Sequence, residues 1–130
     1  MRRWTKKEVV LKANKIFIPV NITDAHWFLA VVIPAAGHVE LYDSLGRAQE
    51  QMGKNIARWV KREAAVHGLP KKQWSVGTMP CRTQENCDDC GVFTCRHVEL
   101  MSKGESAIVW GGSSSYHRRR IAAELLSGSL

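Results

Sequence analysis

The most informative stretch of this 130-residue sequence is Gln84-Glu85-Asn86-Cys87-Asp88-Asp89-Cys90-Gly91. A glutamine stands six residues before a Cys-Gly pair, and an apolar run with helical character follows from Val92 to Met101. The start of a helix suits a reactive thiol, because its partial positive charge and free N–H groups favour the thiolate. We therefore expect Cys90 to be a nucleophile.

Three further groups that a thiol hydrolase needs precede this cysteine in the order histidine, aspartate, glutamine. His26 stands before Trp27, and Asp43 lies within Tyr42-Asp43-Ser44-Leu45. In such a set the thiol attacks, the imidazole moves the proton, the carboxylate orients the imidazole and an amide stabilises the oxyanion. The predicted catalytic residues are His26, Asp43, Gln84 and Cys90.

A β-hairpin is predicted around His26 and Asp43, with strands at 27–33 and 38–42 and a turn at Pro34-Ala35-Ala36-Gly37. If the turn is centred on Ala35-Ala36, Asp43 lies opposite Phe28 and diagonal to His26 on the same face. Diagonal neighbours are about 7–8 Å apart at Cα, which a histidine and a carboxylate can bridge. A slip of one residue would place them on opposite faces.

The other elements follow from apolar spacing and from residues that start or stop helices. They are a strand at Ile16–Val20, a helix from about Ala48 to His67 ended by Gly68-Leu69-Pro70, a strand at Gln73–Met79, a helix from Cys90 or Gly91 to Lys103-Gly104, and a last helix through Leu126 with its N-cap among Ser113-Ser114-Ser115. Because strands cluster early and helices late, the expected fold class is α+β.

Together these motifs resemble the ubiquitin-like-protein-specific cysteine proteases, the SUMO-protease type. The resemblance rests on His-Trp, Tyr-Asp-Ser-Leu and Gln-x-Asn-x-x-Asp-Cys-Gly in that order. Supporting matches are Arg3-Trp4-Thr5-Lys6-Lys7, Ile16-Phe17-Ile18-Pro19-Val20-Asn21, Gly91-Val92-Phe93, and Arg120-Ile121-Ala122 with Leu125-Leu126. It spans about Trp4 to Leu126, and it implies a papain-like cysteine protease architecture with a small mixed sheet flanked by helices.

The resemblance also implies a function. It predicts a cysteine-type peptidase or isopeptidase that cleaves after the C-terminal Gly-Gly of a ubiquitin-like modifier, with SUMO as the first candidate. The expected partners are that modifier and its conjugates, and no cofactor or metal is expected. Gln84 would be the oxyanion donor, and Trp27 would help form a narrow tunnel over the Gly-Gly tail. Core packing is an equally good interpretation of Trp27.

We expect residues 1–130 to form a single catalytic domain. Domains of this family usually begin well before the Trp-Thr-Lys-Lys region. Their upstream part, which carries a substrate-contacting tryptophan and several modifier contacts, has no counterpart here. The resemblance therefore predicts an N-terminally truncated or compact domain, complete in its catalytic residues but with weaker binding of the modifier.

Composition narrows the other possibilities. Hydrophobic content of 45% and charged content of 24% are ordinary for a soluble protein, and no apolar run is long enough for a membrane span. The basic N-terminus has no apolar signal core after it, so a nuclear or cytoplasmic location is expected.

The net charge of +7 has several possible explanations. A solvated basic surface or an acidic protein partner is favoured over nucleic-acid binding, because the basic residues are scattered apart from Arg118-Arg119-Arg120 and two lysine pairs.

Four cysteines lie between positions 81 and 95. Together with His97 they could form a zinc site, but their spacing lacks the two knuckles separated by a loop that such sites show. Cys95 is interpreted as a small core residue, and Cys81 and Cys87 as loop residues without chemistry. Two alternative functions stay open: a catalytically weak module that binds a ubiquitin-like protein, and a zinc-binding or nucleic-acid-binding domain.

Overall fold

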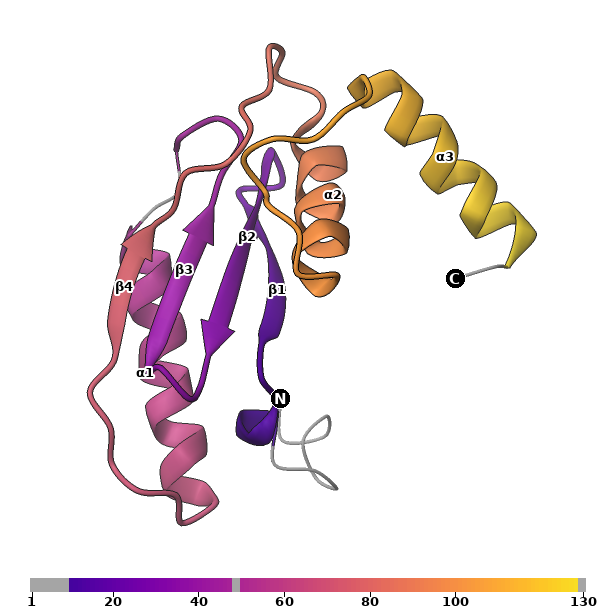
Figure 1. Ribbon diagram of the computed structural model, residues 1–130. Coiled ribbons are helices and arrows are strands. Elements are labelled where there is room, and N and C mark those ends of the chain that lie inside the picture. Colours follow the sequence, from indigo (N-terminus) through magenta and orange to yellow (C-terminus); the bar gives the residue numbers. More distant parts are fainter. Residues whose placement is uncertain (1–9, 48–49, 129–130) are drawn as a thin grey trace.

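The computed structural model describes residues 10–47 and 50–128 (Figure 1). The elements in chain order are a 3₁₀ turn η1 (Val10–Lys12), β1 (Ile16–Ile22), β2 (His26–Ile33), β3 (His38–Tyr42), α1 (Glu50–Val66), β4 (Ser75–Thr78), α2 (Cys90–Ser102) and α3 (Ser114–Ser127). The Arg3–Lys7 motif and the predicted first residues of α1, 48 and 49, lie outside the described residues. None of the helices within those two ranges combines the length and the hydropathy needed to cross a bilayer.

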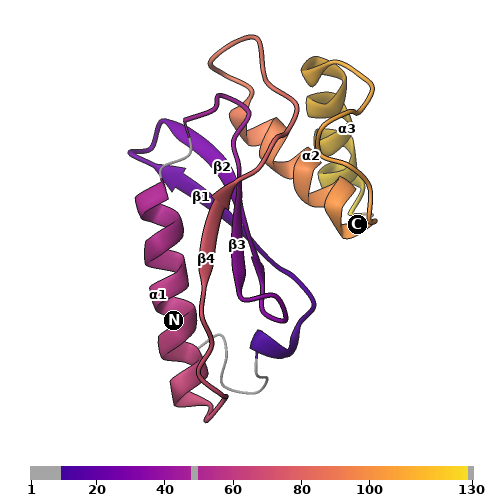
Figure 2. The ribbon, with the colours of Figure 1, turned by 60° about the vertical axis from the view of Figure 1, so that its left-hand side comes forward.

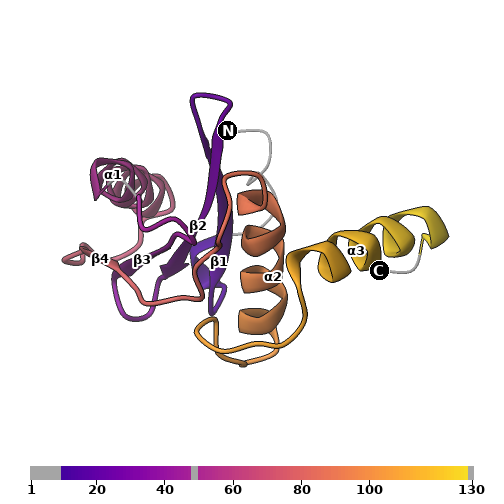
Figure 3. The ribbon, with the colours of Figure 1, turned by 90° about the horizontal axis from the view of Figure 1, so that it is seen from above.

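One four-stranded sheet forms the middle layer, in the order β1-β2-β3-β4. β2 is antiparallel to β1 and to β3, whereas β4 is parallel to β3. Helix α1 covers one face, α2 covers the other, and α3 lies on the far side of α2 (Figures 2 and 3). The predicted α+β class with a small mixed sheet flanked by helices is therefore confirmed.

Strand β2 is buried on both faces, which explains its uninterrupted apolar sequence. Alternate residues Phe28, Ala30 and Val32 pack with Val60 of α1, while Leu29 and Val31 pack with Met101 of α2. At Gly53 the helix α1 approaches the sheet so closely that a Cβ atom would collide with Val76 of β4. The two apolar layers thus meet at β2, the strand that begins with His26.

The β2–β3 hairpin has the predicted register. Leu29 pairs with Tyr42, so that one further step along the ladder places Phe28 opposite Asp43. The turn is closed by a hydrogen bond from the N–H of Gly37 to the carbonyl of Pro34 (3.2 Å), and Gly37 has a φ of +64°, which favours glycine. The prediction that His26 and Asp43 share one face is confirmed.

Two details differ from the predictions. β4 is shorter than Gln73–Met79: β3 starts only at His38, which pairs with Ser75, and the ladder ends with Leu41 opposite Thr78. Cys95 is exposed, so its interpretation as a core residue is wrong. The inward position on α2 belongs instead to His97, which is fully buried beside Phe93 and Trp110.

His97 makes the stability of the protein depend on pH. Both its ring nitrogens are buried without a hydrogen-bond partner among the described residues, and burial lowers its pKa from 6.5 to about 4. Between these two values the unfolded chain binds a proton that the folded chain does not, so that stability falls as the pH falls. This contribution amounts to about 2 kcal/mol between pH 7.5 and pH 5.

We therefore expect the difference in unfolding free energy between His97→Leu and the parent to grow in favour of the variant by about 2 kcal/mol over this range. Urea titrations of both proteins at pH 7.5 and pH 5 measure that difference. A difference that is the same at both pH values would contradict the prediction.

Candidate active site

The four predicted catalytic residues lie at the ends of separate elements. His26 is the first residue of β2, Asp43 follows the last residue of β3, Cys90 is the first residue of α2, and Gln84 lies in the loop between β4 and α2. The starts of β2 and α2 lie at the same end of the molecule (Figure 1). A Cβ atom on Gly91 would lie 3.9 Å from Cδ1 of Trp27, so the residues next to His26 and Cys90 are in close proximity.

His26 and Asp43 are in direct contact. Nε2 of His26 lies 2.9 and 3.0 Å from the two carboxylate oxygens of Asp43. Asp43 is 4% exposed, and its carboxylate also accepts the backbone N–H groups of Leu45 (2.8 Å) and Arg47 (3.1 Å). Because an ionised carboxylate can only accept, Nε2 carries the proton and Nδ1 of a neutral imidazole is the basic nitrogen. Nδ1 is buried, and no described residue hydrogen-bonds to it.

The loop before Cys90 is organised by Asn86. Its side-chain oxygen accepts the N–H groups of Asp88 (3.0 Å) and Asp89 (3.1 Å), and its amide donates to the Asp89 carboxylate (2.7 Å). Asp89 occupies the N-cap of α2, but its carboxylate makes no capping hydrogen bond. The first turn of α2, beginning at Cys90, therefore keeps N–H groups that no cap side chain occupies.

Gln84 is 8% exposed and is held at three points. Its backbone N–H donates to the carbonyl of Ser44 (2.9 Å), its side-chain Nε2 donates to the carbonyl of Asn86 (2.6 Å), and its Oε1 accepts the hydroxyl of Ser44. The loop that carries Gln84 is thus joined to the end of β3, next to Asp43.

The cysteines have different environments. All four are free thiols; Cys87 and Cys95 are exposed, and Cys90 is buried. Burial, and secondarily the negative charge of Asp43, raises the pKa of Cys81 to about 11, so this thiol is protonated at neutral pH. Within residues 10–47 and 50–128, no three His, Cys, Asp or Glu side chains gather as a metal site would require.

Helix α3 supports the loop before Cys90, a role that the sequence did not indicate. Arg118 donates to the carboxylate of Asp89 (2.6 Å), and hydrogen bonds from Ser114, Asn86 and Arg118 lower the pKa of Asp89 to about 2. Arg120 forms a bidentate ion pair with Glu99 of α2. Two arginines of the basic triplet are therefore engaged within the fold. Their partners lie more than twenty residues away, beyond the reach of any local pattern.

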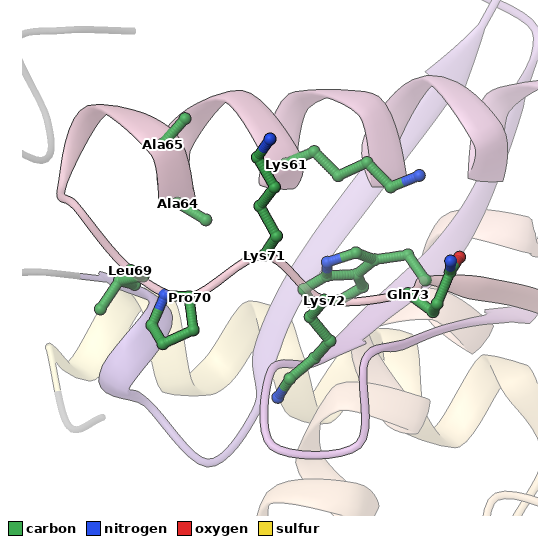
Figure 4. Close-up of a pocket in the computed structure, with 9 residues that line it drawn as sticks. Lys61, Ala64, Ala65, Leu69, Pro70, Lys71, Lys72 and Gln73 are labelled. Carbon is green, nitrogen blue, oxygen red and sulfur yellow. The ribbon is translucent and has the colours of Figure 1, made fainter.

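A cavity of about 450 Å³ lies elsewhere, between the end of α1 and the segment before β4 (Figure 4). Its lining residues are Lys61, Ala64, Ala65, Leu69, Pro70, Lys71, Lys72, Gln73 and Trp74. The amino group of Lys72 is used by the fold, since it donates to the carbonyl of Pro34 (2.7 Å). This cavity is lined by none of the four predicted catalytic residues. The candidate active site lies instead at the opposite end of the sheet, where β2 begins and β3 ends.

Curated proteins with similar sequences are proteases. The chain is 27% identical to a sentrin-specific protease of Caenorhabditis elegans, with 100% of the chain and 19% of that protein aligned. It is 25% identical to ubiquitin-like-specific protease 1 of Saccharomyces cerevisiae, with 97% of the chain and 21% of that protein aligned. The chain thus spans about a fifth of the length of these relatives.

Solved structures agree with the sequence comparison. The C-terminal Ulp1 protease domain in complex with Smt3, the yeast ortholog of SUMO, matches 97% of the chain with a TM-score of 0.78 and 25% identity, over 59% of that domain's chain. A Ulp1-like SUMO protease catalytic domain of Chaetomium thermophilum matches 92% with a TM-score of 0.76 and 29% identity, over 48% of its chain. Residues 1–121 match the Ulp1 protease family, C-terminal catalytic domain. The predicted resemblance is confirmed, and the chain belongs to the Ulp1 protease family.

Proposed function

We propose that this chain is a thiol peptidase or isopeptidase that cleaves after the Gly-Gly end of a ubiquitin-like modifier, with SUMO as the first candidate. The observation that carries the proposal is the contact between His26 and Asp43 at the end of the sheet where α2 begins with Cys90. Residues 1–130 would act as one catalytic domain on modifier conjugates in the nucleus or cytoplasm. Membership of the family supports this choice of substrate.

In the proposed reaction, Nδ1 of His26 removes the proton from Cys90, and the thiolate attacks the carbonyl carbon of the last glycine. Negative charge then develops on the carbonyl oxygen, where the amide of Gln84 and the N–H of Cys90 stabilise it. The protonated imidazole gives its proton to the leaving amine, leaving a thioester on Cys90. His26 next activates a water molecule that hydrolyses the thioester, and Asp43 keeps the ring oriented throughout.

Trp27 is suited to select the glycine tail. Its side chain is 42% exposed, although it lies in the strand that is otherwise the most buried, so core packing does not account for all of it. It flanks Gly91, directly after Cys90. A flat indole beside the nucleophile would restrict the approach to residues without side chains, as a Gly-Gly end requires.

The proposal can be tested with a panel of ubiquitin-like modifiers that carry a thiol-reactive group at the C-terminus. An adduct with one modifier, mapped to Cys90 by mass spectrometry, would establish both the reaction class and the substrate. Binding without an adduct would favour the non-catalytic module, and binding of zinc with neither would favour the third class of function.

Replacement of Cys90 by serine or alanine should reduce kcat/KM for a modifier–fluorophore substrate by more than about 10⁴-fold, because the proposed thioester forms on this thiol. The fold, measured by circular dichroism, should be retained. Cys87→Ser and Cys95→Ser are matched controls, since both thiols are exposed, and they should leave kcat/KM unchanged. Activity that survives in Cys90→Ser but disappears in either control would identify a different nucleophile.

His26→Ala should abolish turnover to a similar degree, whereas Asp43→Asn should lower kcat by a smaller but still large factor, because the imidazole is still present but no longer correctly oriented. Asp24→Asn removes an exposed carboxylate two residues before His26 and serves as the control. Steady-state kinetics on the three variants compare these effects. If Asp43→Asn and Asp24→Asn behave alike, the His26–Asp43 contact has no catalytic part.

Gln84→Ala should lower kcat by about a hundredfold with little change in KM, because the oxyanion contact forms only in the transition state. Gln73→Ala, at an exposed glutamine, is the control.

The 130 residues match only 59% of the solved Ulp1 domain, and the unmatched part of such a domain would contribute uniform binding of the modifier. These residues alone should therefore show a high KM for a full modifier and a kcat near that of a longer family member. A low KM with negligible kcat in the parent would instead favour the binding module.

A further inference from the structure

Ser44 makes two contacts with Gln84 that the proposed reaction does not yet use. It directly follows Asp43, is 3% exposed, and belongs to the turn closed by the hydrogen bond from Gly46 N–H to the Asp43 carbonyl (3.0 Å). Its carbonyl accepts the backbone N–H of Gln84 (2.9 Å), and its hydroxyl contacts the side-chain oxygen of Gln84. A buried hydroxyl in contact with a buried carboxamide restricts the conformations available to both.

The orientation of the Gln84 carboxamide follows from its partners. The carbonyl of Asn86, 2.6 Å from the amide end, can only accept a hydrogen bond, so the atom facing it must be the NH₂ group. The other end is then the oxygen, and the hydroxyl of Ser44 must donate to it. One of the two amide hydrogens is used by the Asn86 carbonyl, and no described residue accepts the second. A flipped amide would set oxygen against oxygen at Asn86 and leave the Ser44 hydroxyl without an acceptor able to receive its proton.

We propose that Ser44 is a positioning residue, which holds the Gln84 carboxamide so that its second N–H is presented to the oxyanion formed at Cys90. This role rests on the proposed function of Gln84. Without the hydroxyl, the carboxamide oxygen would be buried without a donor, and the amide would be held on the side of Asn86 alone. Preorganised donors stabilise an oxyanion because they need not reorient during the reaction, so a loosened amide loses part of its effect.

One turn would then serve two catalytic steps. Asp43 orients the imidazole through its side chain, and the adjacent Ser44 orients the oxyanion donor through its hydroxyl. The two neighbouring residues that follow β3 thus contact two groups that are far apart in the sequence: Asp43 contacts His26, and Ser44 contacts Gln84. A displacement of this turn would disturb proton transfer and oxyanion stabilisation together.

The kinetic test is a double-mutant cycle between Ser44→Ala and Gln84→Ala with the modifier–fluorophore substrate. In the parent background, Ser44→Ala should lower kcat about tenfold, less than removal of the amide itself, while KM stays within about twofold. In the Gln84→Ala background the same change should alter kcat less than about twofold. Ser44→Thr keeps the hydroxyl and should retain at least about a third of the parent kcat. Should Ser44→Ala fail to fold, Ser44→Cys, in which a weak donor replaces the hydroxyl, takes its place in the cycle.

A second measurement is independent of turnover. In the free Ser44→Ala protein, the NMR signals of the Gln84 side-chain NH₂ group should shift, and relaxation measurements should show greater nanosecond motion of that group. The signals and the motion of the exposed Gln73 side chain should not change. An unchanged Gln84 signal would overturn the proposal, as would an equal loss of kcat in both backgrounds. If the parent cleaves no modifier, the proposed function fails, and the NMR comparison still decides whether Ser44 holds Gln84.

Discussion

The register between β2 and β3 is the constraint on which the candidate site depends. Side chains alternate between faces along a strand, so a slip of one residue would separate His26 from Asp43. The register is fixed by two features: the four-residue turn that ends at Gly37, and the burial of β2 on both faces, which requires alternate residues to face α1 and α2. A slip would break every apolar contact of β2 at once. The position of the polar pair at the end of the hairpin is therefore stabilised by the core rather than by the pair itself.

The second half of the site is attached to this hairpin by directional hydrogen bonds in addition to the apolar packing of α2 on β2. The segment after β4 runs beside the end of β3, with the N–H of Met79 bonded to the Leu41 carbonyl (2.8 Å) and that of Gln84 to the Ser44 carbonyl (2.9 Å). Asn86 then shapes the short turn into α2. An exposed apolar loop could not hold a nucleophile to this accuracy, because hydrophobic contacts have no direction, whereas hydrogen bonds fix distance and angle.

Much of this arrangement could be predicted from sequence, because it depends on local patterns. The hairpin register follows from the position of the turn, and the start of α2 at Cys90 follows from the polar loop and the apolar run after it. Long-range contacts could not be predicted. Ser44 and Gln84 are 40 positions apart, and Arg118 and Asp89 are 29 apart, so no local pattern shows that these residues are in contact. The prediction for Cys95 was wrong, and the burial of His97 was not predicted, for a related reason: α2 is apolar on several sides, and spacing alone does not say which side faces inward.

The way α3 is anchored has a consequence for the behaviour of the molecule in solution. Within its described residues only His117 is buried, in ring contact with Trp110, and two ion pairs join the helix to the rest of the fold: Arg118 with Asp89 and Arg120 with Glu99. Dissolved salt screens such pairs, whereas it leaves the apolar layers around β2 almost unaffected. The attachment of α3 should therefore depend on ionic strength, whereas the packing of α1 and α2 on the sheet should not. We therefore expect concentrated electrolyte to weaken the attachment of α3, and with it the support of the loop that carries Asp89, before it affects the sheet.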